Sequence, residues 1–165
     1  MQPYDARSHE WHERKRFVLI IGAIITGLVT IALANAADQT CQPTPPDQLG
    51  PMYKAGAPMR TKVGTGHVLQ GVVRSSRTCQ PLPEALIEIW LAGPHGRYDD
   101  AYRASIIADD AGRYRFESHV PGGYFGRPPH IHMRVSAANH RVLVTQHYPQ
   151  QGQTQATLDL VLQPQ

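Results

Sequence analysis

Short runs of alternating or continuous apolar residues recur from residue 67 to the end of the chain. Turn-forming residues separate these runs at positions 93–94, 110–112 and 121–123. No apolar repeat of helical period extends over ten residues or more in this region. The pattern predicts an all-β domain, a β-sandwich of mostly antiparallel short strands over residues 67–165. The predicted strands are His67–Arg74, Ala85–Ala92, Arg113–Ser118, His130–Ser136, Arg141–Tyr148 and Ala156–Leu162.

The N-terminus has a different pattern. Residues 17–34 carry no charge and directly follow a basic cluster that ends the segment 1–16. We therefore expect one hydrophobic helix over residues 17–36, because about 17 to 25 apolar residues can span a bilayer. It is either a signal peptide cleaved after Ala34-Asn35-Ala36 or an uncleaved transmembrane anchor. Both alternatives keep the basic segment in the cytoplasm, so the rest of the chain is expected outside it, periplasmic, secreted or anchored at the inner membrane.

Residues 37–66 are rich in proline and glycine, which predicts an extended arm rather than a central strand. The chain has only two cysteines, Cys41 in this arm and Cys79 beyond it. An oxidising compartment would allow a disulfide between them. Two independent thiols remain the alternative, because the sequence does not show that the sulfur atoms meet.

Length and charge limit the function classes. The chain has 165 residues, and the part that remains after the N-terminal segment is long enough for one domain. The net charge of +3 is spread over the chain, with four basic and three acidic residues in 1–16 and twelve and ten in 38–165. Because no basic patch forms, nucleic acid is not expected as a partner.

The most specific local feature is a histidine pair after two prolines, Arg127-Pro128-Pro129-His130-Ile131-His132. Side chains two apart on a strand share a face, so His130 and His132 can offer two imidazoles to one metal ion. Paired surface histidines are the alternative. A two-histidine, one-carboxylate site needs a nearby acid, and none follows before Asp159. The other histidines are scattered, which disfavours zinc.

Two tyrosines are candidates for the missing ligands. Tyr98 and Tyr124 each lie beside turn glycines, where the backbone can aim a side chain at a ligand. Tyr114 alternates with Phe116 in a predicted strand and Tyr148 ends another, so both are expected to be packing residues.

Several motifs occur in a fixed order: Ala85–Trp90, Tyr98 eight residues after the Trp, Gly112–Phe116, Pro121–Tyr124, Arg127–His132 and Val144–Tyr148. Together they resemble the signature of the intradiol ring-cleavage dioxygenases, the family of catechol and protocatechuate ring-cleaving enzymes. An early arm with Pro43-Thr44-Pro45 and Gly50–Tyr53 is also similar. The resemblance covers about residues 41–162.

The resemblance implies non-haem iron(III) bound by Tyr98, Tyr124, His130 and His132. A trivalent cation holds a tyrosine as phenolate although its ordinary pKa is near 10. The implied reaction uses dioxygen to open a catechol to a muconate-type diacid, as in the catabolism of aromatic compounds. Tyr124 would leave the metal and accept a substrate proton, and Arg127 would stabilise developing negative charge.

The resemblance also implies that Gln146 orients substrate near the metal. A rival interpretation is a non-catalytic β-sandwich interaction module, or an accessory subunit of a membrane complex, that retains the metal site. Residues 17–34 would then hold it in the membrane if uncleaved. Four intact ligand types favour the enzyme.

Overall fold

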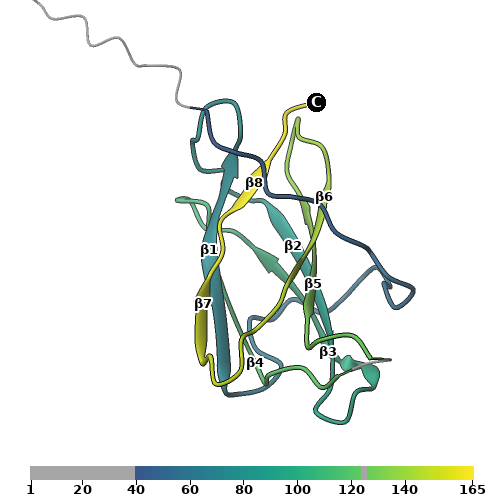
Figure 1. Cartoon of the computed structure of the whole chain (residues 1–165). Coiled ribbons are helices and arrows are strands. Elements are labelled where there is room, and N and C mark those ends of the chain that lie inside the picture. The colour runs from purple at the N-terminus through teal and green to yellow at the C-terminus, as the bar shows by residue number, and fades with distance from the viewer. Residues whose placement is uncertain (1–39, 124–125) are drawn as a thin grey trace, which may run out of the picture. The chain divides into compact units, whose positions relative to one another are not determined.

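The computed structural model describes residues 40–123 and 126–165 (Figure 1). The expected N-terminal helix and Tyr124 lie outside the described residues. Residues 36–165 belong to one compact unit. Across the two described ranges there is no helix, and so none that is long and apolar enough to cross a membrane.

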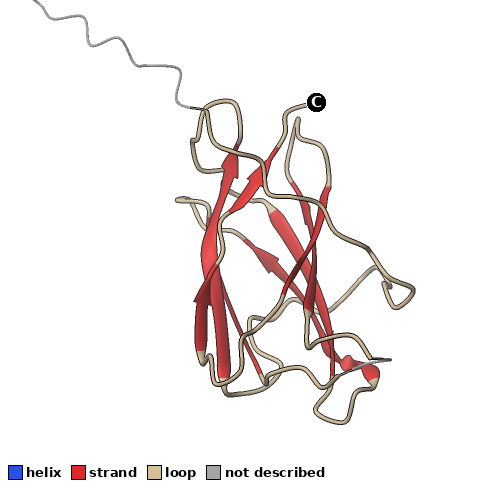
Figure 2. Ribbon diagram, in the orientation of Figure 1, coloured by secondary structure: helices blue, strands red, loops and turns tan. Residues whose placement is uncertain are grey.

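The described residues form eight strands in two facing sheets (Figures 1 and 2). In the first sheet, β1 pairs antiparallel with β4 and parallel with β7 and β8. The second sheet is antiparallel, in the order β3-β2-β5-β6. The predicted all-β class is confirmed. The bounds are β1 His67–Ser75, β2 Leu86–Ala92, β3 Tyr98–Ile107, β4 Arg113–Ser118, β5 Ile131–Ser136, β6 Leu143–His147, β7 Gln155–Thr157 and β8 Leu160–Leu162.

The core follows from strand alternation. Ile87, Ile89 and Leu91 of β2 belong to the buried apolar cluster between the sheets. Glu88 and Trp90 alternate with them and therefore point to the opposite face of the same sheet. They are nevertheless buried, at 7% and 2% exposed. The first sheet packs on the opposite face, so another segment of the chain must cover this outer face.

Two strand predictions were wrong. β3 was not predicted, because its first half carries Asp99 and Asp100 and lacks an apolar alternation. It begins at Tyr98, which was expected in a turn. The predicted strand 156–162 is split into β7 and β8. At the break, the Val72 backbone N–H donates to the Asp159 side chain at 2.9 Å in place of a backbone carbonyl, which interrupts the ladder.

The arm, defined here as residues 41–63, wraps around the sandwich (Figure 1). Its backbone hydrogen-bonds in turn to β8 through Thr44, to β6 through Asp47, to β3 through Pro58 and to β4 through Val63. Its prolines remove backbone donors, which suits a chain that crosses strands instead of pairing along one.

Between its contacts with β6 and β3, the arm crosses the outer face of the second sheet. A β-carbon on Gly50 would lie 3.1 Å from Cε1 of His132 on β5. Tyr53 donates its hydroxyl to Glu88 of β2 at 3.0 Å. The arm therefore helps to bury the polar outer face of this sheet, including His132.

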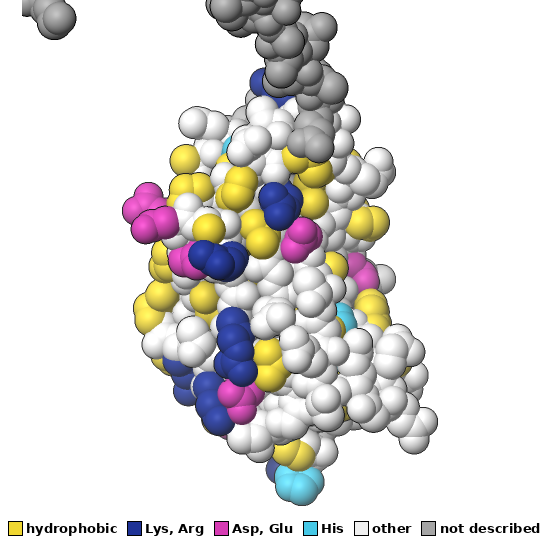
Figure 3. Space-filling view, turned by 90° about the vertical axis from the view of Figure 1, so that its left-hand side faces the viewer, with side chains coloured by type: hydrophobic (Ala, Val, Ile, Leu, Met, Phe, Trp, Pro, Cys, Tyr) yellow, Lys and Arg dark blue, Asp and Glu magenta, His cyan; other side chains and the backbone are white. Residues whose placement is uncertain are grey.

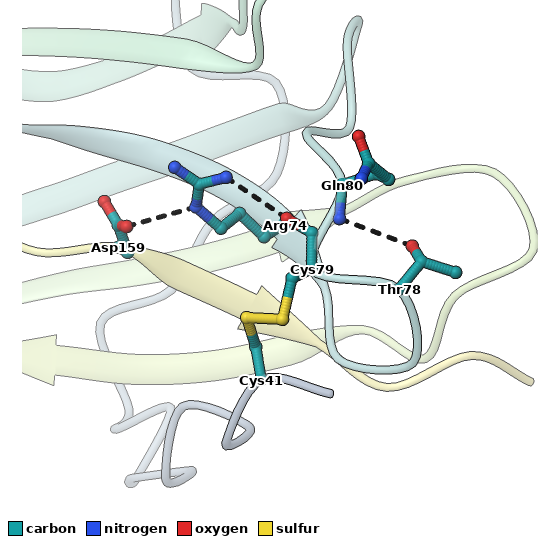
Figure 4. Close-up of a disulfide and its surroundings, with 6 residues drawn as sticks. All are labelled: Cys41, Arg74, Thr78, Cys79, Gln80 and Asp159. Carbon is teal, nitrogen blue, oxygen red and sulfur yellow. Dashed lines mark hydrogen bonds and ion pairs between the residues drawn. A yellow bond between two sulfur atoms is a disulfide. The ribbon is translucent and has the colours of Figure 1, made fainter. Parts of the chain in front are cut away.

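A disulfide links Cys41 at the start of the arm to Cys79, with Cα atoms 5.2 Å apart (Figure 4). The sequence left this pairing open. Arg74 supports the same corner, donating to the Cys79 carbonyl at 3.1 Å and to Asp159 at 3.2 Å. The arm is thus covalently fixed to the loop after β1.

Charged side chains of both signs are interspersed on the face that carries β1 and β7 (Figure 3). Lys62 pairs with Glu117, and Arg113 pairs with Asp109, at 2.9 and 3.2 Å. This arrangement agrees with the even charge distribution in the sequence and forms no extended basic patch on that face.

Candidate metal centre

The pairing of β2 and β5 positions the candidate ligands. In their register, Trp90 lies opposite His132, and on the other side of β5 His132 lies opposite Gln146 of β6. His130 precedes β5 by one residue and shares the outer face with His132. Tyr98 begins β3 at the same end of the sheet, where it pairs with Ala92.

Three donor atoms converge at this end. The Tyr98 hydroxyl lies 3.2 Å from Nε2 of His130, which lies 3.1 Å from Nε2 of His132. Both imidazoles are 2% exposed. The structure therefore brings together Tyr98, His130 and His132, as the sequence predicted. Tyr124, the fourth predicted ligand, lies outside the described residues, but Gly123 before it contacts Gly96, two residues before Tyr98.

The protonation pattern of His130 favours a shared cation. Its Nδ1 lies 2.8 Å from the Pro128 carbonyl, which only accepts, so Nδ1 carries the proton and Nε2 presents a lone pair. That single lone pair faces both the Tyr98 hydroxyl and His132 Nε2. One metal ion satisfies all three atoms, since ligand atoms about 2.0–2.2 Å from an ion lie about 3 Å apart.

His132 is oriented differently. Its ring stacks on Trp90, with centroids 4.8 Å apart and planes 4° apart. Its buried Nδ1 forms no hydrogen bond of standard geometry with the described residues. Burial, followed by the charges of His130 and Arg127, lowers the pKa of His132 to about 4, although the Gln48 backbone and Asp47 oppose this. The ring is therefore neutral at pH 7 and can bind a metal.

A second histidine pair shows the contrast. His67 and His147 also have Nε2 atoms 3.1 Å apart, but the angle between their ring planes is only 16° and the ring centroids are 5.2 Å apart. His67 Nδ1 is bonded to the Gln153 carbonyl, so His147 donates to His67 in one N–H···N bond. The rings of His130 and His132 instead lie at 77° with centroids 4.7 Å apart.

Arg127 is held by a polar network that extends to the arm. It donates to Gln146 at 2.9 Å and to the Tyr148 hydroxyl at 3.1 Å. Tyr148 donates to Asp47 at 2.9 Å, and Gln146 donates to the Gln48 carbonyl at 2.6 Å. Tyr148 was predicted to be a packing residue only, so the sequence missed this polar role. Its position after Gln146 gave no signal that the hydroxyl would reach Arg127.

A pocket of about 260 Å³ adjoins Tyr98 and Trp90, and the arm residues Pro51 and Tyr53 form part of its wall. This volume suits a small aromatic ring better than a large ligand. A larger groove, about 490 Å³, lies between the start of the arm, β6 and β8, and it holds none of the donor atoms. Within residues 40–123 and 126–165, no group of three His, Cys, Asp or Glu is arranged to hold a metal.

The fold is an all-β sandwich, and two imidazoles and one phenol oxygen converge at one end of its second sheet. The sequence model of the dioxygenase family, Dioxygenase_C, matches residues 50–162. Catechol 1,2-dioxygenase of Acinetobacter baylyi is 36% identical over 154 residues, covering 70% of this chain and 47% of that protein. Hydroxyquinol 1,2-dioxygenase of Rhodococcus opacus is 30% identical, covering 80% and 54%.

Solved structures agree. The dioxygenase domain of a carbohydrate-binding fusion protein from Streptomyces sp. SirexAA-E has a TM-score of 0.68 and 28% identity, covering 75% of this chain and 100% of that domain. Catechol 1,2-dioxygenase of Pseudomonas arvilla C-1 gives 0.64 and 26%, covering 73% and 62%. This chain belongs to the intradiol ring-cleavage dioxygenase family. It spans about half the length of the curated catechol 1,2-dioxygenase from Acinetobacter baylyi.

Proposed function

We propose that this protein opens a catechol between its two hydroxyl-bearing carbons, adding both atoms of dioxygen to give a muconate-type diacid. Non-haem iron(III) is held by Tyr98, Tyr124, His130 and His132. The convergence of Tyr98, His130 and His132 donor atoms at 3.1 and 3.2 Å is the observation that carries the proposal.

The donor set fits a trivalent ion. Two phenolates and two neutral imidazoles offset much of the charge of iron(III) and stabilise it against reduction. When bound, iron(III) supplies the Lewis acidity that favours the ionised forms of phenol and catechol hydroxyls. The Gly96 contact with Gly123 supports Tyr124 as the second phenol, because it brings the residues that precede the two tyrosines close together.

The remaining site residues bind and orient. Arg127, fixed by Gln146 and Tyr148, presents a permanent positive charge where negative charge develops on the substrate. Gln146 is itself fixed to the arm, which keeps its amide orientation constant. Tyr124 accepts a proton from the bound catechol. The wall formed by the arm and Trp90 restricts water access.

An anaerobic visible spectrum with metal analysis tests the iron site. Wild-type protein is expected to bind one iron and to show a tyrosinate-to-iron(III) band that shifts when catechol is added. Tyr98→Phe should lose most of this band. Tyr114→Phe is the matched control, because it removes a hydroxyl that bonds only the Leu158 carbonyl in the core. A colourless wild-type protein after iron reconstitution would refute the assignment.

We also propose that the domain works outside the cytoplasm. The support is the disulfide between Cys41 and Cys79, which persists in oxidising compartments, and the apolar segment 17–34 in the sequence. A C-terminal reporter enzyme that is active only after export tests this. An inactive reporter on a fusion protein that accumulates at full length would contradict it.

A further inference from the structure

The two candidate histidine ligands are held by different means. His130 is oriented by the hydrogen bond from Nδ1 to the Pro128 carbonyl. His132 Nδ1 has no hydrogen bond of such geometry in the described part of the chain, and only a weaker interaction with the Gln48 backbone acts on it; its ring stacks on Trp90 and lies close to Gly50. The direction of His132 Nε2 therefore depends on packing, and above all on the plane of Trp90.

Trp90 needs an anchor of its own. Its indole Nε1 is buried and has no hydrogen-bond partner among the described residues. Among the described residues, its other aromatic neighbour is Tyr53 of the arm, with centroids 5.1 Å apart and planes at 58°. The position of Tyr53 therefore limits how far the Trp90 ring can tilt.

Tyr53 is fixed by a charge pair in which Glu88 is buried and Arg134 is half-buried. Its hydroxyl donates to one oxygen of Glu88 at 3.0 Å, and Arg134 donates to the other at 2.6 Å. Glu88 and Arg134 face each other across β2 and β5, two residues along from the pair Trp90 and His132. Burial and Glu88 raise the pKa of Tyr53, so the hydroxyl stays protonated and donates.

We propose that Tyr53 is a positioning residue for the metal ligand His132, acting through Trp90. The inference rests on the proposed function, since it takes His132 as an iron ligand. The Glu88 and Arg134 pair holds the Tyr53 hydroxyl, Tyr53 fixes the tilt of Trp90, and Trp90 fixes the direction of the imidazole. The arm thereby takes part in the metal centre as well as covering it.

Tyr53→Phe tests this, because it removes the hydroxyl and keeps the ring. Ser105→Ala is the matched control: Ser105 donates its hydroxyl to the Ala57 carbonyl at 3.0 Å, so it also removes one hydrogen bond between arm and sheet. The measurements are the urea midpoint, the rate of iron(III) release to a chelator, and the visible tyrosinate band.

Both variants are expected to lower the urea midpoint to a similar extent. Only Tyr53→Phe should speed iron release, by about threefold to tenfold, and broaden the band, since partners of metal ligands change affinity by about 10- to 100-fold and Tyr53 acts one residue further away. Tyr53→Leu, which also removes the ring, should release iron faster still.

Equal iron release by wild type, Tyr53→Phe and Ser105→Ala would overturn the positioning role and leave the proposed function intact. Equal acceleration in both variants would also overturn it, because a loosened arm alone would then explain the effect. A wild-type protein that takes up no iron would instead refute the proposed function, and this failure is visible before any variant is compared.

Discussion

Gly50→Ala should damage the metal centre through a single added methyl group. Gly50 has φ of +70°, and its new β-carbon would lie 3.1 Å from Cε1 and 3.6 Å from Nε2 of His132. The left-handed backbone costs alanine about 1–2 kcal/mol in the free energy of unfolding. In addition, the imidazole must move by a few tenths of an ångström to relieve this contact, and the stacked Trp90 ring limits where it can go.

Gly56→Ala separates these two effects. Gly56 lies in the same arm with φ of +77°, but nothing lies within 4 Å of its added β-carbon. Both variants should therefore lose about 1–2 kcal/mol of stability, measured by urea unfolding. Only Gly50→Ala should also lose about tenfold to 100-fold in iron affinity and in kcat/KM for catechol. If the two variants bind iron and turn over alike, the arm does not constrain His132 and the account of the site is wrong.

Further predictions concern pH, the disulfide and Arg127. Burial, followed by the charge of His67, lowers the pKa of His147 to about 4, so folding favours its neutral form. This stabilisation is complete above about pH 6.5 and is lost as the pH falls toward 4. His147→Gln should therefore reduce the loss of unfolding free energy between pH 6.5 and 4 by about 1–2 kcal/mol, after allowance for solvent screening. Reducing Cys41–Cys79 should lower the free energy of unfolding by about 2–4 kcal/mol, because the bond closes a separation of 38 residues. Arg127→Lys should lower kcat for catechol at least about tenfold with iron content unchanged, because lysine lacks the planar fork that bonds Gln146 and Tyr148.

For each of these three predictions, one experimental outcome would contradict the reasoning. An identical pH dependence of unfolding in wild type and His147→Gln would show that the N–H···N pair does not set the acid limit. A reductant that destabilises a Cys41→Ser, Cys79→Ser double variant as much as wild type would act elsewhere than on the disulfide. Unchanged kcat in Arg127→Lys would remove Arg127 from the reaction.

The sequence predicted those features that depend on local alternation. Strands β1, β2, β4 and β5 follow apolar patterns, and spacing alone places His130 and His132 on one face. β3 was missed because the first half of this strand is polar. The arm covers its outer face at Ser105, and no periodicity in the sequence indicates where the arm lies.

Long-range contacts were beyond the sequence. The pair His67 and His147 joins residues 80 positions apart, and neither residue has a local pattern that indicates the other. Likewise, the sequence gives no sign that Glu88 and Arg134 differ from other charged residues in alternating strands. Their role follows only from strand register and from the arm that lies across them.

The proposed function requires this chain to insert both oxygen atoms of dioxygen into a catechol while the ring opens. Incubation of the iron-loaded protein with catechol under oxygen-18 gas, followed by mass spectrometry of the product, tests it most directly. The expected product is a muconate-type diacid that carries two labelled oxygen atoms and does not form with Tyr98→Phe. A quinone, a singly labelled product or unchanged catechol would contradict it.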